Sequence, residues 1–154
     1  MSVSGKPSFL LKPTLDTRFH IDYDWWDRSS GEDLRIYMLS HLLPDQRDRL
    51  SQVQQDRVID FVDPETGEVS QLDELGLAVR MAAQEPDFIN SQISTVDAIF
   101  RVFLRNGNRP LSPRELEQQT GTPASTILKM LSGVRIYKGI KPYIEGEESD
   151  TNDD

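Results

Sequence analysis

Three polar side chains near the N-terminus have residue types that bind divalent metal ions. His20, Asp22 and Asp24 alternate with Ile21 and with aromatic residues, so an extended strand would place all three on one face. Imidazole and carboxylate groups are reasonable ligands for a divalent ion. On a straight strand, however, the three side chains would spread over roughly 13 Å at ~3.3 Å per residue, which is too far for one ion. The pattern therefore favours a solvated strand face, and we expect no bound metal.

A second group of carboxylates lies between residues 63 and 68. Asp63, Glu65 and Glu68 could provide oxygen ligands for calcium, but their spacing does not match the calcium loop of an EF-hand. Pro64 and Gly67 lie among them, and this composition is typical of a turn. We therefore expect a turn between two strands here.

The chain offers little for covalent or redox catalysis. It contains no cysteine and only two histidines, His20 and His41, which excludes disulfides, thiol catalysis and Cys-ligated metal centres. The sequence has no glycine-rich phosphate-binding motif. His41 lies close to the apolar face of a predicted helix, where a packed histidine is more common than a catalytic one. We expect a protein without enzymatic activity or cofactor, and carboxylate catalysis by Asp22 and Asp24 is the enzymatic alternative.

Three helix starts follow one another in the C-terminal third. Ser94 and Ser112-Pro113 each precede a helical pattern, and Thr122-Pro123 repeats the combination of a capping side chain and a proline. Gly121 separates the second helix from the third, and Gly133 ends the third. The first helix has an apolar face formed by Ile99, Phe100, Phe103 and Leu104.

After Gly133 the pattern becomes typical of strands. Apolar residues alternate with polar ones, and Lys138-Gly139 can form a two-residue hairpin turn because glycine tolerates a positive φ. The apolar positions are Val134, Ile136, Ile140 and Ile144. We expect a small hairpin after the third helix.

Three helices, a tight turn and a following hairpin make this segment resemble the winged helix-turn-helix superfamily. The resemblance covers about a third of the chain. Glu117 departs from it, because the family usually has a small residue there that faces the other helix. This departure predicts a wider angle between the two helices, or a register shifted by one residue. The matching positions are Leu116, Gly121, Ile127, Met130 and Leu131, together with the apolar first helix.

The resemblance implies that the third helix enters the major groove of double-stranded DNA. Ile127 and Leu131 would face inward on this helix. The residues implied to contact DNA are Arg114, Ala124, Ser125, Lys129, Ser132, Arg135, Lys138 and Lys141, of which Arg135 and Lys138 would lie on the wing.

The local charge agrees with a DNA contact. Residues 109–143 hold six basic and two acidic residues, whereas the whole chain has a net charge of −9. A surplus of four positive charges is modest. It could neutralise roughly four phosphates, and each neutralised phosphate adds about −0.9 to the slope of the logarithm of the binding constant against the logarithm of the salt concentration. We therefore expect weak binding by one copy and useful affinity only as a dimer or within a complex.

The last ten residues, 145–154, include six carboxylates and no basic residue. This composition predicts a disordered acidic tail that keeps the protein soluble. The alternative is a tail that folds over the basic wing and competes with nucleic acid.

The N-terminal region predicts an α+β module. Strand-like patterns cover residues 18–26, 57–62 and 68–70, and helical patterns cover residues 33–43, 45–55 and 72–84. Trp25 and Trp26 would point to opposite sides of an extended chain. We expect them to pack under the next helix, with an exposed tryptophan in a partner interface as the alternative.

Taken as a whole, the sequence predicts an α+β chain that is mainly helical. Residues 9–92 would form the N-terminal module with short strands, residues 93–144 the winged helix-turn-helix, and residues 145–154 the tail. No segment approaches the ~18 apolar residues of a membrane span, and the N-terminus lacks an apolar signal-peptide core. We expect a cytoplasmic, transcription-regulatory DNA-binding protein with no membrane partner. The alternative is a protein-interaction adaptor, or a subunit of a larger nucleoprotein complex, in which the winged helix is structural and the Trp25-Trp26 segment or the Asp63–Val69 hairpin contacts a partner. The N-terminal module is also a candidate element for binding a protein or forming a homodimer.

Overall fold

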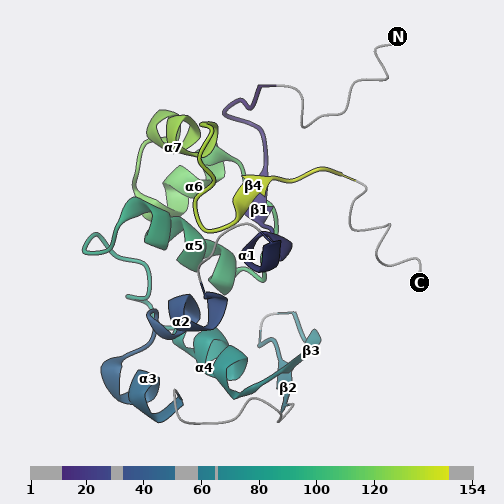
Figure 1. Cartoon of the computed structure of the whole chain (residues 1–154), viewed down its shortest axis with the longest axis vertical. Coiled ribbons are helices and arrows are strands. Elements are labelled where there is room, and N and C mark those ends of the chain that lie inside the picture. The colour runs from purple at the N-terminus through teal and green to yellow at the C-terminus, as the bar shows by residue number, and fades with distance from the viewer. Residues whose placement is uncertain (1–11, 29–32, 51–58, 65, 146–154) are drawn as a thin grey trace. The chain divides into compact units, whose positions relative to one another are not determined.

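The computed structural model describes residues 12–28, 33–50, 59–64 and 66–145, and these residues form a mainly helical α+β structure (Figure 1). They divide into two units, one within Met1–Trp25 and Ile89–Asp154 and the other within Trp26–Phe88. The predicted N-terminal module of residues 9–92 is therefore not one unit, because the segment around Phe19 groups with the C-terminal helices. The boundary predicted between residues 92 and 93 lies between Phe88 and Ile89. None of the helices in the described ranges is long and apolar enough to cross a membrane.

The first unit contains helices α5 (Thr95–Arg105), α6 (Pro113–Thr120) and α7 (Ala124–Leu131). The hydroxyl of Ser94 accepts a hydrogen bond from the Asp97 backbone N at 3.1 Å. The hydroxyl of Ser112 likewise accepts from the Glu115 backbone N, and the Glu115 carboxylate accepts from the Ser112 backbone N in return. Both N-caps predicted from the sequence are therefore confirmed.

The core of this unit is built on the apolar face of α5, as its helical spacing predicts. Ile99, Phe100, Phe103 and Leu104 are all buried, and Leu116 of α6 and Ile127 and Leu131 of α7 are buried with them. Gly121 ends α6 at φ 81°, in the left-handed conformation that glycine adopts without a steric penalty.

The strand that follows α7 pairs with the N-terminal segment and not with a neighbour in sequence. Strand β4 (Ile140–Pro142) is antiparallel to β1 (Phe19–Ile21), with His20 opposite Lys141. Phe19 also forms a bridge to Leu111, the residue before the α6 cap. The two strands lie side by side in Figure 1.

The predicted hairpin wing is therefore wrong. Residues 134–136 form no strand, and Val134 is fully exposed. The tight turn at Lys138 and Gly139 does form, with φ values of 55° and 78°, but the chain enters it from an irregular loop. Phe19 and Ile21 of β1 and Ile140 of β4 are all buried in this unit, and the burial of these apolar side chains favours the pairing of the two strands.

Asn108 fixes the end of β1 through both groups of its side-chain amide. The Ile21 backbone N donates to Asn108 Oδ1 at 2.8 Å, and Asn108 Nδ2 donates to the Ile21 carbonyl at 2.9 Å. Asn108 itself has φ 62°, a left-handed conformation that asparagine tolerates better than most residues. Beyond Ile21 the chain turns into helix α1 (Asp24–Arg28), so the alternation predicted up to Trp26 ends early.

Replacing Asn108 with alanine should destabilise the first unit by about 2–4 kcal/mol. The variant loses two partly buried hydrogen bonds and places alanine in the left-handed region. Asn106→Ala is the matched control, because the Asn106 amide makes the same paired hydrogen bonds to the nearby Arg109 backbone. Urea unfolding should show a loss below about 1.5 kcal/mol for the control. Equal losses would contradict a role of Asn108 in holding β1.

The second unit combines helices with one β-hairpin. The helices are α2 (Leu34–Leu39), α3 (Pro44–Leu50) and α4 (Glu74–Ala82), and the strands are β2 (Ile59–Val62) and β3 (Val69–Leu72). All of them lie within the predicted segments or within two residues of them. The remainder of the helix predicted to run to residue 55 lies outside the described residues.

The turn between β2 and β3 is held by hydrogen bonds and an ion pair. The Asp63 backbone N donates to the Glu68 carbonyl at 2.8 Å, and Arg80 Nη2 of α4 lies 3.2 Å from Asp63 Oδ2. The Arg80 guanidinium also lies over the Phe61 ring, 4.8 Å from its centroid. The predicted turn is thus confirmed, and the carboxylate of Asp63 is used to join the hairpin to α4.

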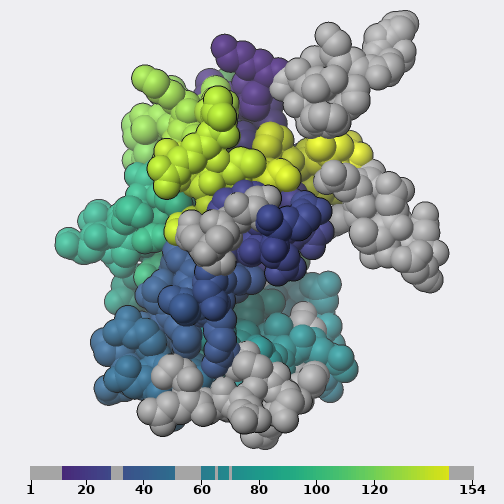
Figure 2. Space-filling view, in the orientation of Figure 1, coloured from purple at the N-terminus to yellow at the C-terminus, as the bar shows by residue number. Residues whose placement is uncertain are grey.

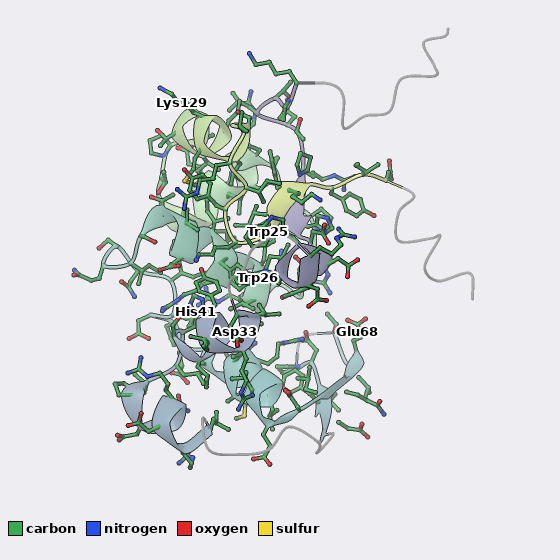
Figure 3. The ribbon with its side chains drawn as sticks, in the orientation of Figure 1. Trp25, Trp26, Asp33, His41, Glu68 and Lys129 are labelled. Carbon is green, nitrogen blue, oxygen red and sulfur yellow. The ribbon has the colours of Figure 1, made fainter. Side chains whose placement is uncertain are left out.

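The two adjacent tryptophans occupy different surroundings. Trp26 is buried, whereas Trp25 is partly exposed. Trp26 stacks on Tyr37 with ring centroids 5.3 Å apart, and Tyr37 meets the edge of His41 at 4.6 Å. Figure 3 labels Trp25, Trp26 and His41. His41 is a packed histidine in this cluster, and Trp26 packs against the next helix, as the sequence predicts.

Candidate nucleic-acid interface

Helices α6 and α7 are joined by only three residues, Gly121 to Pro123. This is the turn length of a helix-turn-helix unit. The seam between the helices consists of Leu116, Ile127 and Leu131, which are at most 6% exposed. Burial of this seam fixes which side of α7 remains available for a ligand.

The start of α7 differs from the prediction. Pro123 occupies the N-cap position and provides no side-chain cap, so Thr122-Pro123 does not repeat the start of α6. Instead, Glu117 Oε1 accepts a hydrogen bond from the Ala124 backbone N at 3.0 Å. The residue that departs from the superfamily pattern therefore caps α7 from the preceding helix.

Ala124 was predicted to face outward, and this is wrong. Ala124, Ile127 and Leu131 follow one another at intervals of three and four residues, so they share the inner face of α7. Only 9% of Ala124 is exposed. The helical spacing therefore places the first side chain of α7 in the core and not on the outer surface.

Ser125 and Lys129 form the outer face of α7. Both are exposed, and their separation of four residues places them one above the other on the helix. Figure 3 shows Lys129 extending away from α7. Within the described part of the chain, Lys129 forms no ion pair. Ser132, which follows α7 directly, is partly exposed.

The loop after α7 provides two more basic side chains. Arg135 is exposed, and its guanidinium lies over the Tyr137 ring, 5.0 Å from the centroid. Lys138 is half-buried in the turn before β4. Figure 2 shows the chain from α7 to β4, in light green to yellow, as one continuous surface on the viewed face.

The other two cations predicted to contact DNA are paired with carboxylates of the N-terminal segment. Arg114 Nε lies 3.0 Å from Asp16 Oδ1, and Lys141 Nζ lies 3.0 Å from Asp22 Oδ2. Each would have to leave its carboxylate, or share it, to neutralise a phosphate. The surface available to a phosphate backbone is therefore less positive than the local sequence suggests.

The three residues first considered as metal ligands lie in different surroundings. Asp22 pairs with Lys141, His20 meets the edge of Tyr143 at 5.2 Å, and Asp24 lies in α1 beyond the end of the strand. Among the described residues, no group of three potential ligand side chains is placed to hold a metal ion.

Charge is distributed unevenly between the two units. The described residues of the first unit include ten basic and seven acidic side chains, and those of the second include five basic and eleven acidic ones. Positive charge is thus concentrated in the unit that contains α7.

Comparison with models of protein families, with curated proteins and with solved structures found no match. The chemistry available to a ligand follows from the side chains of α7 and of the loop after it. A hydroxyl at Ser125, an ammonium at Lys129 and a guanidinium at Arg135 are all hydrogen-bond donors, and such groups bind phosphate oxygens and the acceptor edges of bases.

Proposed function

We propose that the chain binds double-stranded DNA through α6 and α7 and acts as a transcription-regulatory protein. The observation that supports this most directly is the short turn between two helices whose buried seam leaves Ser125 and Lys129 on the outer face of the second. A winged helix-turn-helix fold is part of the proposal. In it, the position of the hairpin wing is taken by the loop before β4, while β1 provides the strand partner.

In this proposal α7 enters the major groove with its N-terminal residues towards the base edges. Ser125 would donate to a base or a phosphate, and Lys129, one turn further on, to a phosphate or a guanine edge. Arg135 and Lys138 would contact the backbone from the loop. Because few cations take part, we expect two copies on adjacent half-sites to bind much better than one.

The decisive experiment compares binding to a mixed-sequence duplex by fluorescence anisotropy at low and moderate salt. Lys129→Glu combined with Arg135→Glu should weaken binding at low salt by about tenfold or more, and should reduce the salt slope by about two phosphate equivalents. The matched control is Arg47→Glu combined with Arg49→Glu in α3, which makes the same change in charge at exposed residues of the second unit.

The control pair should bind DNA almost as well as the wild type. If both pairs weaken binding equally, net charge and not the face of α7 determines the affinity. If the wild type does not bind at low salt, the DNA-binding proposal is rejected.

A second candidate function is that of a protein-interaction adaptor, or of a subunit of a nucleoprotein complex in which α5, α6 and α7 are structural. The pairing of Arg114 and Lys141 with Asp16 and Asp22 favours it, because internal pairing reduces the number of cations available to phosphates. This function predicts that the wild type fails to bind DNA at low salt but binds a protein partner through its N-terminal module, and that the charge reversal at Lys129 and Arg135 leaves this binding unchanged.

A further inference from the structure

Glu117 places a negative charge at the end of α7 that approaches DNA first in helix-turn-helix docking. Its side chain is exposed on α6, and its Oε1 accepts from the Ala124 backbone N at 3.0 Å. The N-terminus of a helix carries a partial positive charge that attracts phosphate. A carboxylate at this position offsets that charge and repels phosphate.

We propose that Glu117 limits the affinity of α7 for DNA and directs phosphate contacts towards Lys129 and Arg135. This inference rests on the proposed DNA-binding function. Pro123 gives α7 no side-chain cap of its own, so the Glu117 carboxylate occupies the place where a phosphate oxygen would otherwise accept from Ala124 N. Phosphate would then bind less tightly, through the side chains of Lys129 and Arg135, and not through the N-terminus of α7.

A purely structural role for Glu117 makes a different prediction. Glutamine at this position keeps an oxygen that can accept from Ala124 N, but it removes the charge. If Glu117 only caps α7, Glu117→Gln should leave both the melting temperature and the DNA affinity unchanged. If its charge opposes DNA, the same variant should keep its melting temperature and bind DNA more tightly.

The experiment measures the full chain against the same mixed-sequence duplex by fluorescence anisotropy. Glu117→Gln should bind roughly three- to tenfold more tightly than the wild type at low ionic strength. The gain should shrink as salt is added, because the charge is solvent-exposed and is screened. Glu68→Gln, at the exposed turn of the second unit, makes the same change in net charge and should alter the affinity by less than about twofold.

Each outcome bears on the proposal. Tighter binding by Glu117→Gln but not by Glu68→Gln supports it. Unchanged or weaker binding by Glu117→Gln, with a wild type that binds DNA, overturns it and leaves the proposed function intact. Absence of binding by the wild type and by Glu117→Gln alike overturns both.

Discussion

A fragment of residues 93–144, the boundaries predicted from the sequence, should fail to fold. The same helices should fold in the full chain, because β1 completes their core. We expect the fragment to show a random-coil far-UV circular dichroism spectrum and no cooperative melting. A folded fragment with a sharp melting transition would show that β1 is dispensable.

The reason lies in the side chains that β1 contributes. Phe19 and Ile21 are at most 1% exposed. The Phe19 backbone also exchanges hydrogen bonds with Leu111 in both directions, at 2.8 and 3.0 Å. Truncation of a buried phenylalanine to alanine costs about 3–5 kcal/mol, and of a buried isoleucine about 2–5 kcal/mol. Together these losses are comparable with the whole stability of a typical domain, about 5–15 kcal/mol.

A point variant tests the same contribution without changing chain length. Phe19→Ala in the full chain should lower the free energy of unfolding of the first unit by about 3–5 kcal/mol. Tyr23→Ala is the comparison, because Tyr23 is a nearby aromatic residue that is 37% exposed; its loss should be smaller by about 2 kcal/mol or more. Similar losses in urea unfolding would argue against a core role for β1.

The features predicted correctly from the sequence are local. Ser94 and Ser112 cap their helices, and Gly121 ends α6, because each of these contacts joins residues at most four positions apart. The apolar face of α5 follows in the same way from the helical period. The pairing of β1 with β4 joins residues about 120 positions apart, and an alternating pattern shows which face of a strand is buried but not which strand is its partner.

In the candidate site, too, the local features could be predicted from the sequence and the long-range contacts could not. The outward positions of Ser125 and Lys129 follow from the helical period once Ile127 and Leu131 are inside. The inward position of Ala124 follows from the same period, because Ala124 precedes Ile127 by three residues and Leu131 by seven, so the prediction that it faces outward misapplied this period. The ion pairs of Arg114 and Lys141 could not be predicted, since their partners lie 98 and 119 positions away.

Glu117 is an intermediate case. Its departure from the superfamily pattern is visible in the sequence, and that departure is the signal that marks it. Its role is not visible there, because a contact across a turn, from α6 to a backbone N seven residues later, follows neither the helical nor the strand period.

Replacement of Trp26 with alanine should unfold the second unit or leave it marginally stable. Trp26 is 5% exposed, and its ring stacks on Tyr37 of α2, which in turn contacts His41. Loss of a large buried aromatic side chain costs about 3–5 kcal/mol. Hydrogen exchange of the α2 and α4 amides, followed by mass spectrometry, measures the loss within this unit. Protection equal to that of the wild type would contradict the packing role of Trp26.

Trp25→Ala is the matched control and also bears on the adaptor function. Trp25 is partly exposed, so its removal should cost less than about half of what the removal of Trp26 costs, and amide protection in α2 and α4 should change little. A protein partner that uses this segment must therefore contact Trp25, because binding through Trp26 would require the second unit to open. Loss of partner binding in Trp25→Ala with preserved amide protection would identify an interface. Loss in Trp26→Ala would report only the unfolding of the unit.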